Sequence, residues 1–150
     1  MRSSRGSLLR ALRKGGYLKI KCKNIEELYQ QLAEIALNSM DNMSKTEILE
    51  SLGAQSKTPP VFMGHGISIL NIYNAKPEQR ICFVISLYES LQIPDKDEQI
   101  DCVFFLLSPL DDIEGHLATL SDISKFCRSV HRRKQIKDAE TVEDVIAAII

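Results

Sequence analysis

Two long apolar runs constrain the fold of this 150-residue chain more than any other feature of its sequence. Residues 80–88 and 100–108 are apolar at nearly every position rather than at alternate positions. Strands of this kind are buried on both faces, because helices cover both sides of the sheet that contains them. We therefore predict that both runs are central strands of one sheet. Both are far shorter than the ~20 residues of a membrane-spanning helix, so neither is expected to cross a bilayer.

Two further segments predict strands beside this pair, and a third predicts a loop. Residues 17–22 alternate between apolar and polar side chains, as a half-buried strand does, and residues 67–72 read as another strand. The loop is expected over residues 55–66, where Gly64 and Gly66 allow backbone conformations that are closed to other residues.

Helices are predicted between and after these strands. Asn24 and Ser44 are suited to cap two of them, the second ending at Gly53, and Thr141 is suited to cap the last. Helices before, between and after strands predict an α/β fold, with a mixed central β-sheet that helices flank on both faces.

A long helix is also expected after Pro109, starting near Asp111 and Glu114. Its apolar positions are expected to face the sheet. They are Ile113, Leu117, Leu120, Ile123, Phe126, Cys127 and Val130. Residues 131–134, His-Arg-Arg-Lys, are expected to form the solvated, basic end of this same helix.

The start of the chain is basic, with eight Lys or Arg and no acid in the first 23 residues. We expect Leu8, Leu9 and Leu12 to dock a short helix on the body while its arginines stay solvated. An organelle transit peptide or an anchor to an anionic surface are the alternatives. The predicted organisation is a basic N-terminal helix or tail over residues 1–16 and one domain over residues 17–150, a length that supports a real hydrophobic core.

The cysteines and acidic residues do not predict a metal site or a cofactor. Cys22, Cys82, Cys102 and Cys127 form no CxxC pair, so buried reduced thiols in a cytoplasmic protein are expected. The acids at positions 95, 97, 98, 111 and 112 are interpreted as solvated turns. No glycine-rich phosphate loop is present, and nucleic acid is not expected as a partner because Trp is absent and no recognition helix is evident.

One region carries a more specific pattern. Gly64-His65-Gly66-Ile67-Ser68-Ile69-Leu70-Asn71 is followed by an apolar run that ends in Ser108-Pro109, and then by His116-Leu117-Ala118-Thr119-Leu120. This order resembles enzyme IIA of the bacterial phosphoenolpyruvate-dependent phosphotransferase system, in the fructose/mannitol or nitrogen-regulatory class. The resemblance covers about residues 17–150 and implies that family's α/β fold.

The resemblance also implies positions for a phosphoryl-transfer site, and the chain departs from the family there. The acceptor histidine falls at Asn71, the proline before it at Leu70, and an arginine that helps to neutralise phosphate at Leu49. An amide nitrogen has no basic lone pair, so Asn71 is not expected to carry phosphate. The second family histidine falls at His116.

Two interpretations of His116 stay open. At the start of a helix its ring could lie beside free backbone N–H groups suited to an anion, or it could simply pack against Ile113 and Leu120. His65 could replace the lost acceptor only if its loop turned inward, although about 20 Å of extended chain separates it from position 71.

The resemblance therefore implies a cytoplasmic, regulatory, protein-binding domain that has lost its acceptor histidine. Its expected contact region is Gly64, His65, Gly66, Ser68, Leu70, Asn71 and His116. The expected partners are a transporter, a sensor kinase or the histidine phosphocarrier protein, with a homodimer as a further possibility. The alternatives are an active phosphocarrier that uses His116 or His65, and a cytosolic transporter domain that shares only the fold.

Overall fold

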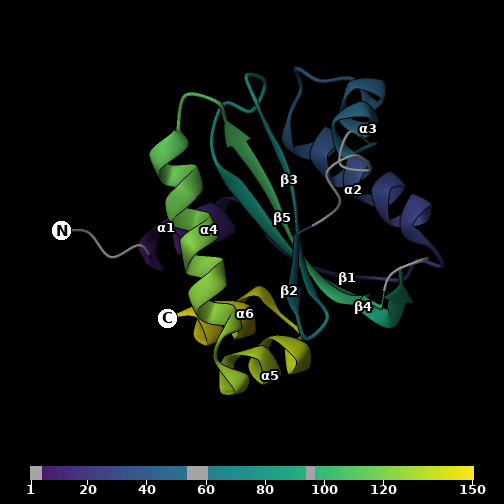
Figure 1. Ribbon diagram of the computed structural model, residues 1–150. Coiled ribbons are helices and arrows are strands. Elements are labelled where there is room, and N and C mark those ends of the chain that lie inside the picture. Colours follow the sequence, from purple (N-terminus) through teal and green to yellow (C-terminus); the bar gives the residue numbers. More distant parts are fainter. Residues whose placement is uncertain (1–4, 54–60, 94–96) are drawn as a thin grey trace.

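The computed structural model describes residues 5–53, 61–93 and 97–150, and it consists of a sheet between two layers of helices (Figure 1). The sheet has five strands in the order β1-β4-β5-β3-β2. Helices α2 and α3 cover one face, and α1, α4, α5 and α6 lie on the other (Figure 1). The predicted α/β class with helices on both faces is confirmed.

The elements follow one another along the chain as strands and helices of moderate length. The strands are β1 (Gly16–Ile20), β2 (Val61–Gly64), β3 (Ile67–Asn74), β4 (Ile81–Gln92) and β5 (Gln99–Pro109). The helices are α1 (Arg5–Lys14), α2 (Ile25–Ser39), α3 (Lys45–Gly53), α4 (Ile113–Cys127), α5 (Val130–Asp138) and α6 (Val142–Ile149).

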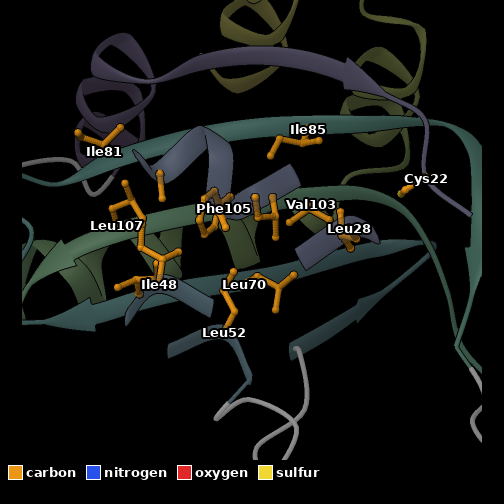
Figure 2. Close-up of a cluster of buried hydrophobic side chains, with 14 of the residues drawn as sticks. Cys22, Leu28, Ile48, Leu52, Leu70, Ile81, Ile85, Val103, Phe105 and Leu107 are labelled. Carbon is orange, nitrogen blue, oxygen red and sulfur yellow. The ribbon is translucent and has the colours of Figure 1, made fainter. Parts of the chain in front are cut away.

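The sheet is mixed, and its central strand comes from one of the two long apolar runs. β5 pairs antiparallel with β4 and parallel with β3, while β1 pairs parallel with β4 and β2 antiparallel with β3. Successive side chains of β5 enter opposite cores. Phe105 packs under α2 and α3 (Figure 2), and Phe104 packs on the other side against Phe126 of α4. Burial on both faces, predicted from the unbroken apolar runs, is confirmed.

The predicted helix starts are confirmed by their capping hydrogen bonds. Asn24 accepts a bond from the Glu27 N–H (2.8 Å). The Ser44 hydroxyl accepts one from the Glu47 N–H (3.1 Å), and the Glu47 carboxylate accepts one from the Ser44 N–H (3.0 Å). Thr141 begins α6 in the same reciprocal way. Each cap satisfies N–H groups that have no partner within the helix.

The basic start of the chain forms helix α1, which packs on the sheet face shared with α4. Leu8 and Leu12 are fully buried and Arg10 and Arg13 are exposed, as expected, whereas Leu9, which was also expected to dock, is only half-buried. The backbone N–H of Leu8 also donates to a buried carboxylate oxygen of Asp122 (3.0 Å). Within the described ranges, no helix has the length and apolar character needed to span a membrane.

The prediction of a loop over residues 55–66 is wrong for its last part. Residues 61–64 form strand β2, which pairs with β3 across a turn made by Gly64, His65 and Gly66. These three residues have positive φ angles of 83°, 58° and 81°. A four-residue edge strand shows no clear alternation, so its pairing depends on β3 and not on a local pattern. The earlier residues of the expected loop, 54–60, lie outside the described residues.

The prediction of one long helix up to residue 134 is also wrong. Helix α4 ends at Cys127, and Ser129 caps a separate helix, α5, that carries the basic residues. The cap of α4 is Asp112 rather than Asp111. Ile113, Leu117 and Val130 were expected to face the sheet but are 47%, 56% and 72% exposed. Apolar residues follow two overlapping stripes of this helix, and the sheet covers the stripe of His116, Thr119, Ile123 and Phe126.

The four cysteines are buried, and none forms a disulfide, as expected. Burial raises the pKa of the Cys82 thiol to about 12 and that of Cys127 to about 11. Thiols with such pKa values are protonated near neutral pH and are poor nucleophiles. The cysteines therefore act as small core residues.

Candidate functional site

The candidate site lies where β3 and β5 end and α4 begins. Asn71 and Tyr73 lie on the same face of β3, since side chains alternate along a strand. Asn71 is paired in register with Leu106 of β5, and Tyr73 with Ser108. His116, in the first turns of α4, reaches this edge of the sheet from the helix layer.

The ring of His116 is held in one orientation. It stacks on the ring of Tyr73 with 4.2 Å between centroids and 4° between planes. Its Nδ1 lies 2.8 Å from the hydroxyl oxygen of Ser108, and the residue is only 5% exposed. Burial, and then the positive charge of Arg80, lower the pKa of His116 below its ordinary value, while Asp112 opposes this shift. His116 is therefore a buried, neutral imidazole near neutral pH.

The start of α4 already has a negative side chain at its cap, Asp112, which is paired with a positive one, Arg80, from the residue before β4. The Asp112 carboxylate accepts a bond from the Gly115 N–H (3.2 Å) and pairs with the guanidinium of Arg80. The Arg80 side chain is 13% exposed and crosses over Gly115, where a Cβ atom would lie 1.9 Å from the guanidinium. The anion position expected at this helix end is thus filled by Asp112.

The structure divides the residues of the predicted contact region among three places. Asn71 is half-buried and lies one alternation, about 7 Å of strand, from Tyr73, so it and His116 belong to the same end of the sheet. Leu70 is fully buried on the opposite face, in the core under α2 and α3 (Figure 2). Ser68, which is also fully buried, alternates in step with Leu70. Leu70 and Ser68 therefore lie inside the fold and not at its surface.

Gly64, His65 and Gly66 lie at the other end of β3, in the turn that joins it to β2. His65 is exposed and lines an open groove of about 950 Å³ together with Gly66 and side chains of α5. Strand β3 separates this turn from Asn71. The expectation that His65 lies far from position 71 along extended chain is consistent with this arrangement.

The groups that hold His116 were not predicted from the sequence. The interpretation of a packed ring named Ile113 and Leu120, but the stacking partner is Tyr73, and Ile113 is half-exposed. The one available signal was the position of Tyr73, two residues after Asn71 on the same strand face. Arg80 stands immediately before its apolar run, and nothing local indicates its pairing with Asp112.

Across residues 5–53, 61–93 and 97–150, no three His, Cys, Asp or Glu side chains come together in a way that could hold a metal ion.

The sequence of residues 17–150 matches the family model described as phosphoenolpyruvate-dependent sugar phosphotransferase system, EIIA 2. No curated protein matches the chain significantly.

Solved structures share the fold at low sequence identity. Nitrogen regulatory protein IIA-Ntr from Neisseria meningitidis has a TM-score of 0.80 at 20% identity, covering 91% of this chain and 94% of that one. IIA mannitol from Escherichia coli has a TM-score of 0.72 at 10% identity, covering 92% and 97%. The complex of Escherichia coli enzyme IIAMtl with phosphorylated enzyme IIBMtl gives a TM-score of 0.69 at 10% identity, covering 91% and 94%.

Proposed function

Since the chain belongs to the EIIA 2 family of the phosphoenolpyruvate-dependent sugar phosphotransferase system, we propose that it is a member that does not relay a phosphoryl group. It acts instead as a regulatory domain that binds other proteins in the cytoplasm. The observation that carries this proposal is the residue at position 71, an asparagine where the family resemblance expects the acceptor histidine.

The chemistry of the two side chains supports this proposal. A histidine ring offers a basic nitrogen that can attack phosphorus, whereas the amide nitrogen of Asn71 has its lone pair delocalised into the carbonyl. Leu70 also replaces the proline that the resemblance expects before the acceptor, and Leu49 replaces the expected arginine. The changes at positions 71 and 49 remove groups that phosphoryl transfer would use, and the change at position 70 removes the proline before the acceptor.

The surroundings of His116 support the same proposal. Its ring is stacked on Tyr73, bonded to Ser108 and 5% exposed, so little of it is presented to a partner. The first-turn N–H of Gly115, which could otherwise bind a phosphoryl oxygen, already donates to the Asp112 carboxylate, and Arg80 is paired with the same carboxylate. These features disfavour the alternative that His116 is the acceptor.

His65 is an equally poor substitute. It occupies a turn at the opposite end of β3 from Tyr73 and His116. A phosphoryl group on His65 would have neither the Ser108 hydroxyl nor the first turn of α4 near it. The expected helpers of transfer and the exposed ring are thus on different parts of the molecule.

The surface beside His116 supports protein binding. Leu110, Ile113 and Leu117 are 53%, 47% and 56% exposed and lie at the end of β5 and on the first turns of α4. Grouped apolar side chains at a surface favour protein contacts. A relative, mannitol enzyme IIA, has been solved in complex with phosphorylated enzyme IIB. We propose a transporter, a sensor kinase or the histidine phosphocarrier protein as partner here, with a homodimer as a further possibility.

A phosphorelay assay tests the proposal. The chain is incubated with labelled phosphoenolpyruvate, enzyme I and the histidine phosphocarrier protein, beside the variants Asn71→His and Leu70→Pro/Asn71→His. We expect no label on the wild-type chain and a gain of label in the double variant, because the missing acceptor is then restored. Label on the wild-type chain, mapped to His116 or His65, would instead establish an active phosphocarrier.

A further inference from the structure

A groove of about 950 Å³ lies at the end of β3 opposite to Tyr73 and His116. Its walls come from β1, β4, β5, the turn between β2 and β3, and α5, which lies beside that turn (Figure 1). Ile67 lines the groove, and about 20 Å of extended β3 separates it from Tyr73. The volume is that of small-molecule sites. The groove is therefore distinct from the site described above.

An interruption in the pairing of β4 with β5 shapes one wall. Ser86 pairs with Cys102 and Leu91 with Ile100, so the intervening residues of β4 lie opposite Asp101 alone. The hydroxyl of Ser90 donates to the Asp101 carboxylate, which fixes the bulged segment. Bulges of this kind redirect side chains and are frequent beside binding sites. Here the bulged segment includes Tyr88, which is 65% exposed and lines the groove.

The turn between β2 and β3 forms a second, closely packed wall. The carbonyl of Gly66 accepts bonds from the N–H groups of Asp101 (2.7 Å) and Cys102 (3.1 Å). A Cβ atom at Gly66 would lie 2.1 Å from the Asp101 carboxylate, so only glycine fits. Next to it, His65 has a φ of 58°, a left-handed conformation that few non-glycine residues adopt. The packing thus holds His65 at the rim.

Cations from two elements converge on the groove. Helix α5 contributes Arg133, Lys134 and Lys137, and β1 contributes Lys19, whose ammonium lies 4.9 Å from the centroid of the Tyr88 ring. Lys134 already pairs with Asp138 (2.9 Å). Within the described part of the chain, neither Lys19 nor Lys137 has a carboxylate partner at ion-pair distance. Two ammonium groups and an exposed aromatic ring therefore face one groove.

We propose that this groove binds a nucleoside monophosphate. The base stacks on the face of the Tyr88 ring that Lys19 leaves open, and Lys19 and Lys137 take the phosphate, with Arg133 near it. The carboxylates of Asp97 and Glu98, on the same groove, accept hydrogen bonds from ribose hydroxyls or base amino groups.

The acidic side chains of the groove decide between this ligand and a longer polyanion. Asp97, Glu98, Asp101 and Asp138 share the groove with the cations. A nucleic-acid strand would bring many phosphates close to these carboxylates, and repulsion between the negative charges would weaken its binding. A nucleoside monophosphate places its one phosphate beside the cations, and its ribose hydroxyls or base amino groups can donate to the carboxylates. This site is independent of the proposed function, because it uses none of the residues around Asn71 and His116.

The test is a titration of the full chain, labelled with ¹⁵N, by adenosine monophosphate, ribose 5-phosphate and inorganic phosphate. Adenosine monophosphate at millimolar concentration is expected to shift the amide signals of residues 65–67, 86–90 and 133–138. Stacking of the base should make its binding about tenfold tighter than that of ribose 5-phosphate. Ribose 5-phosphate binding as tightly, or the absence of any shift with adenosine monophosphate, would overturn the proposal.

Three variants locate the binding. Tyr88→Leu should weaken the binding of adenosine monophosphate about tenfold and change that of ribose 5-phosphate far less, because the base loses its stacking partner whereas Lys19 loses a ring contact but keeps its charge. Lys137→Gln should weaken the binding of all three phosphate-containing ligands. Lys14→Gln, at an exposed position of α1 outside the groove, is the matched control and should change nothing. Equal losses in Lys14→Gln and Lys137→Gln would show attraction to the net charge alone and would contradict the proposed site.

Discussion

The ring of Tyr73 lies flat against the ring of His116, with centroids 4.2 Å apart and an angle of 4° between the planes. This contact joins the strand that carries Asn71 to the first turns of α4. With the bond to Ser108, it fixes the one histidine that the family resemblance places in the phosphoryl-transfer site. The retained histidine is thus part of the packing between sheet and helix.

The stack predicts a measurable coupling between its two rings. Single variants Tyr73→Ala and His116→Ala and the double variant form a thermodynamic cycle in urea unfolding. Each single variant should lower the free energy of unfolding. We expect the sum of these two losses to exceed the loss in the double variant by about 1 kcal/mol, the scale of aromatic pairs. Strictly additive losses would show that the two rings do not stabilise each other.

The lowered pKa of His116 predicts a pH dependence of stability. The unfolded chain binds a proton near its ordinary pKa of 6.5, whereas the folded chain binds it only at lower pH. The contribution of neutral His116 is therefore complete above pH 6.5 and is lost as the pH falls toward the folded pKa. Urea unfolding of the wild type between pH 7 and pH 5 should show this loss in the free energy of unfolding. Its full size is ~1.4 kcal/mol for each unit by which the pKa of His116 in the folded chain lies below that in the unfolded chain.

Two variants separate this effect from the other titrating groups. His116→Gln should flatten the loss of stability between pH 7 and pH 5, because the titrating ring is gone. His65→Gln, on the exposed turn, should keep the wild-type dependence. An NMR titration of the His116 ring that gave a pKa at or above the ordinary value would contradict the account.

A close approach of backbones predicts a large effect at Gly15. A Cβ atom there would lie 2.0 Å from the carbonyl oxygen of Cys82, so Gly15→Ala must displace α1 from the sheet. We expect a loss of about 2 kcal/mol in the free energy of unfolding, as for other overpacked positions. The matched control is Gly6→Ala, whose Cβ would meet only the flexible end of Arg10. Equal stability of the two variants would contradict the close packing at Gly15.

The buried carboxylate of Asp122 predicts how α1 is anchored. The replacement Asp122→Ala removes the acceptor of the Leu8 N–H. We expect it to lower the free energy of unfolding by about 2 kcal/mol, as for hydrogen bonds to charged groups. Helix α1 should also detach more often from the rest of the fold, so trypsin should cleave after Arg10 and Arg13 faster than in the wild type. Unchanged cleavage at these two arginines would contradict an anchoring role for Asp122.

The fold could be predicted from the sequence where local chemistry determines it. Unbroken apolar runs indicate β4 and β5 because few other arrangements bury both strand faces. Asn24, Ser44 and Thr141 indicate helix starts because a side-chain oxygen at that position satisfies a free N–H. These signals require no knowledge of distant residues, and the structure contains all of these elements.

The sequence-based predictions were wrong where contacts between distant residues determine the structure. Strand β2 is four residues long and exists through its pairing with β3. The orientation of α4 depends on which of two apolar stripes the sheet covers, and a sequence pattern alone does not choose between them. In the site, the family resemblance indicated Asn71 and His116. The stack on Tyr73 and the pairing of Arg80 with Asp112 depend on how α4 crosses the sheet edge.

The most direct test of the central claim is the intact mass of the chain after incubation with phosphoenolpyruvate, enzyme I and the histidine phosphocarrier protein, recorded at alkaline pH where phosphohistidine survives. The phosphocarrier protein in the same tube is the positive control, since it must gain one phosphoryl group. We predict that the chain keeps its unmodified mass. A stable gain of one phosphoryl group by the wild-type chain would contradict it.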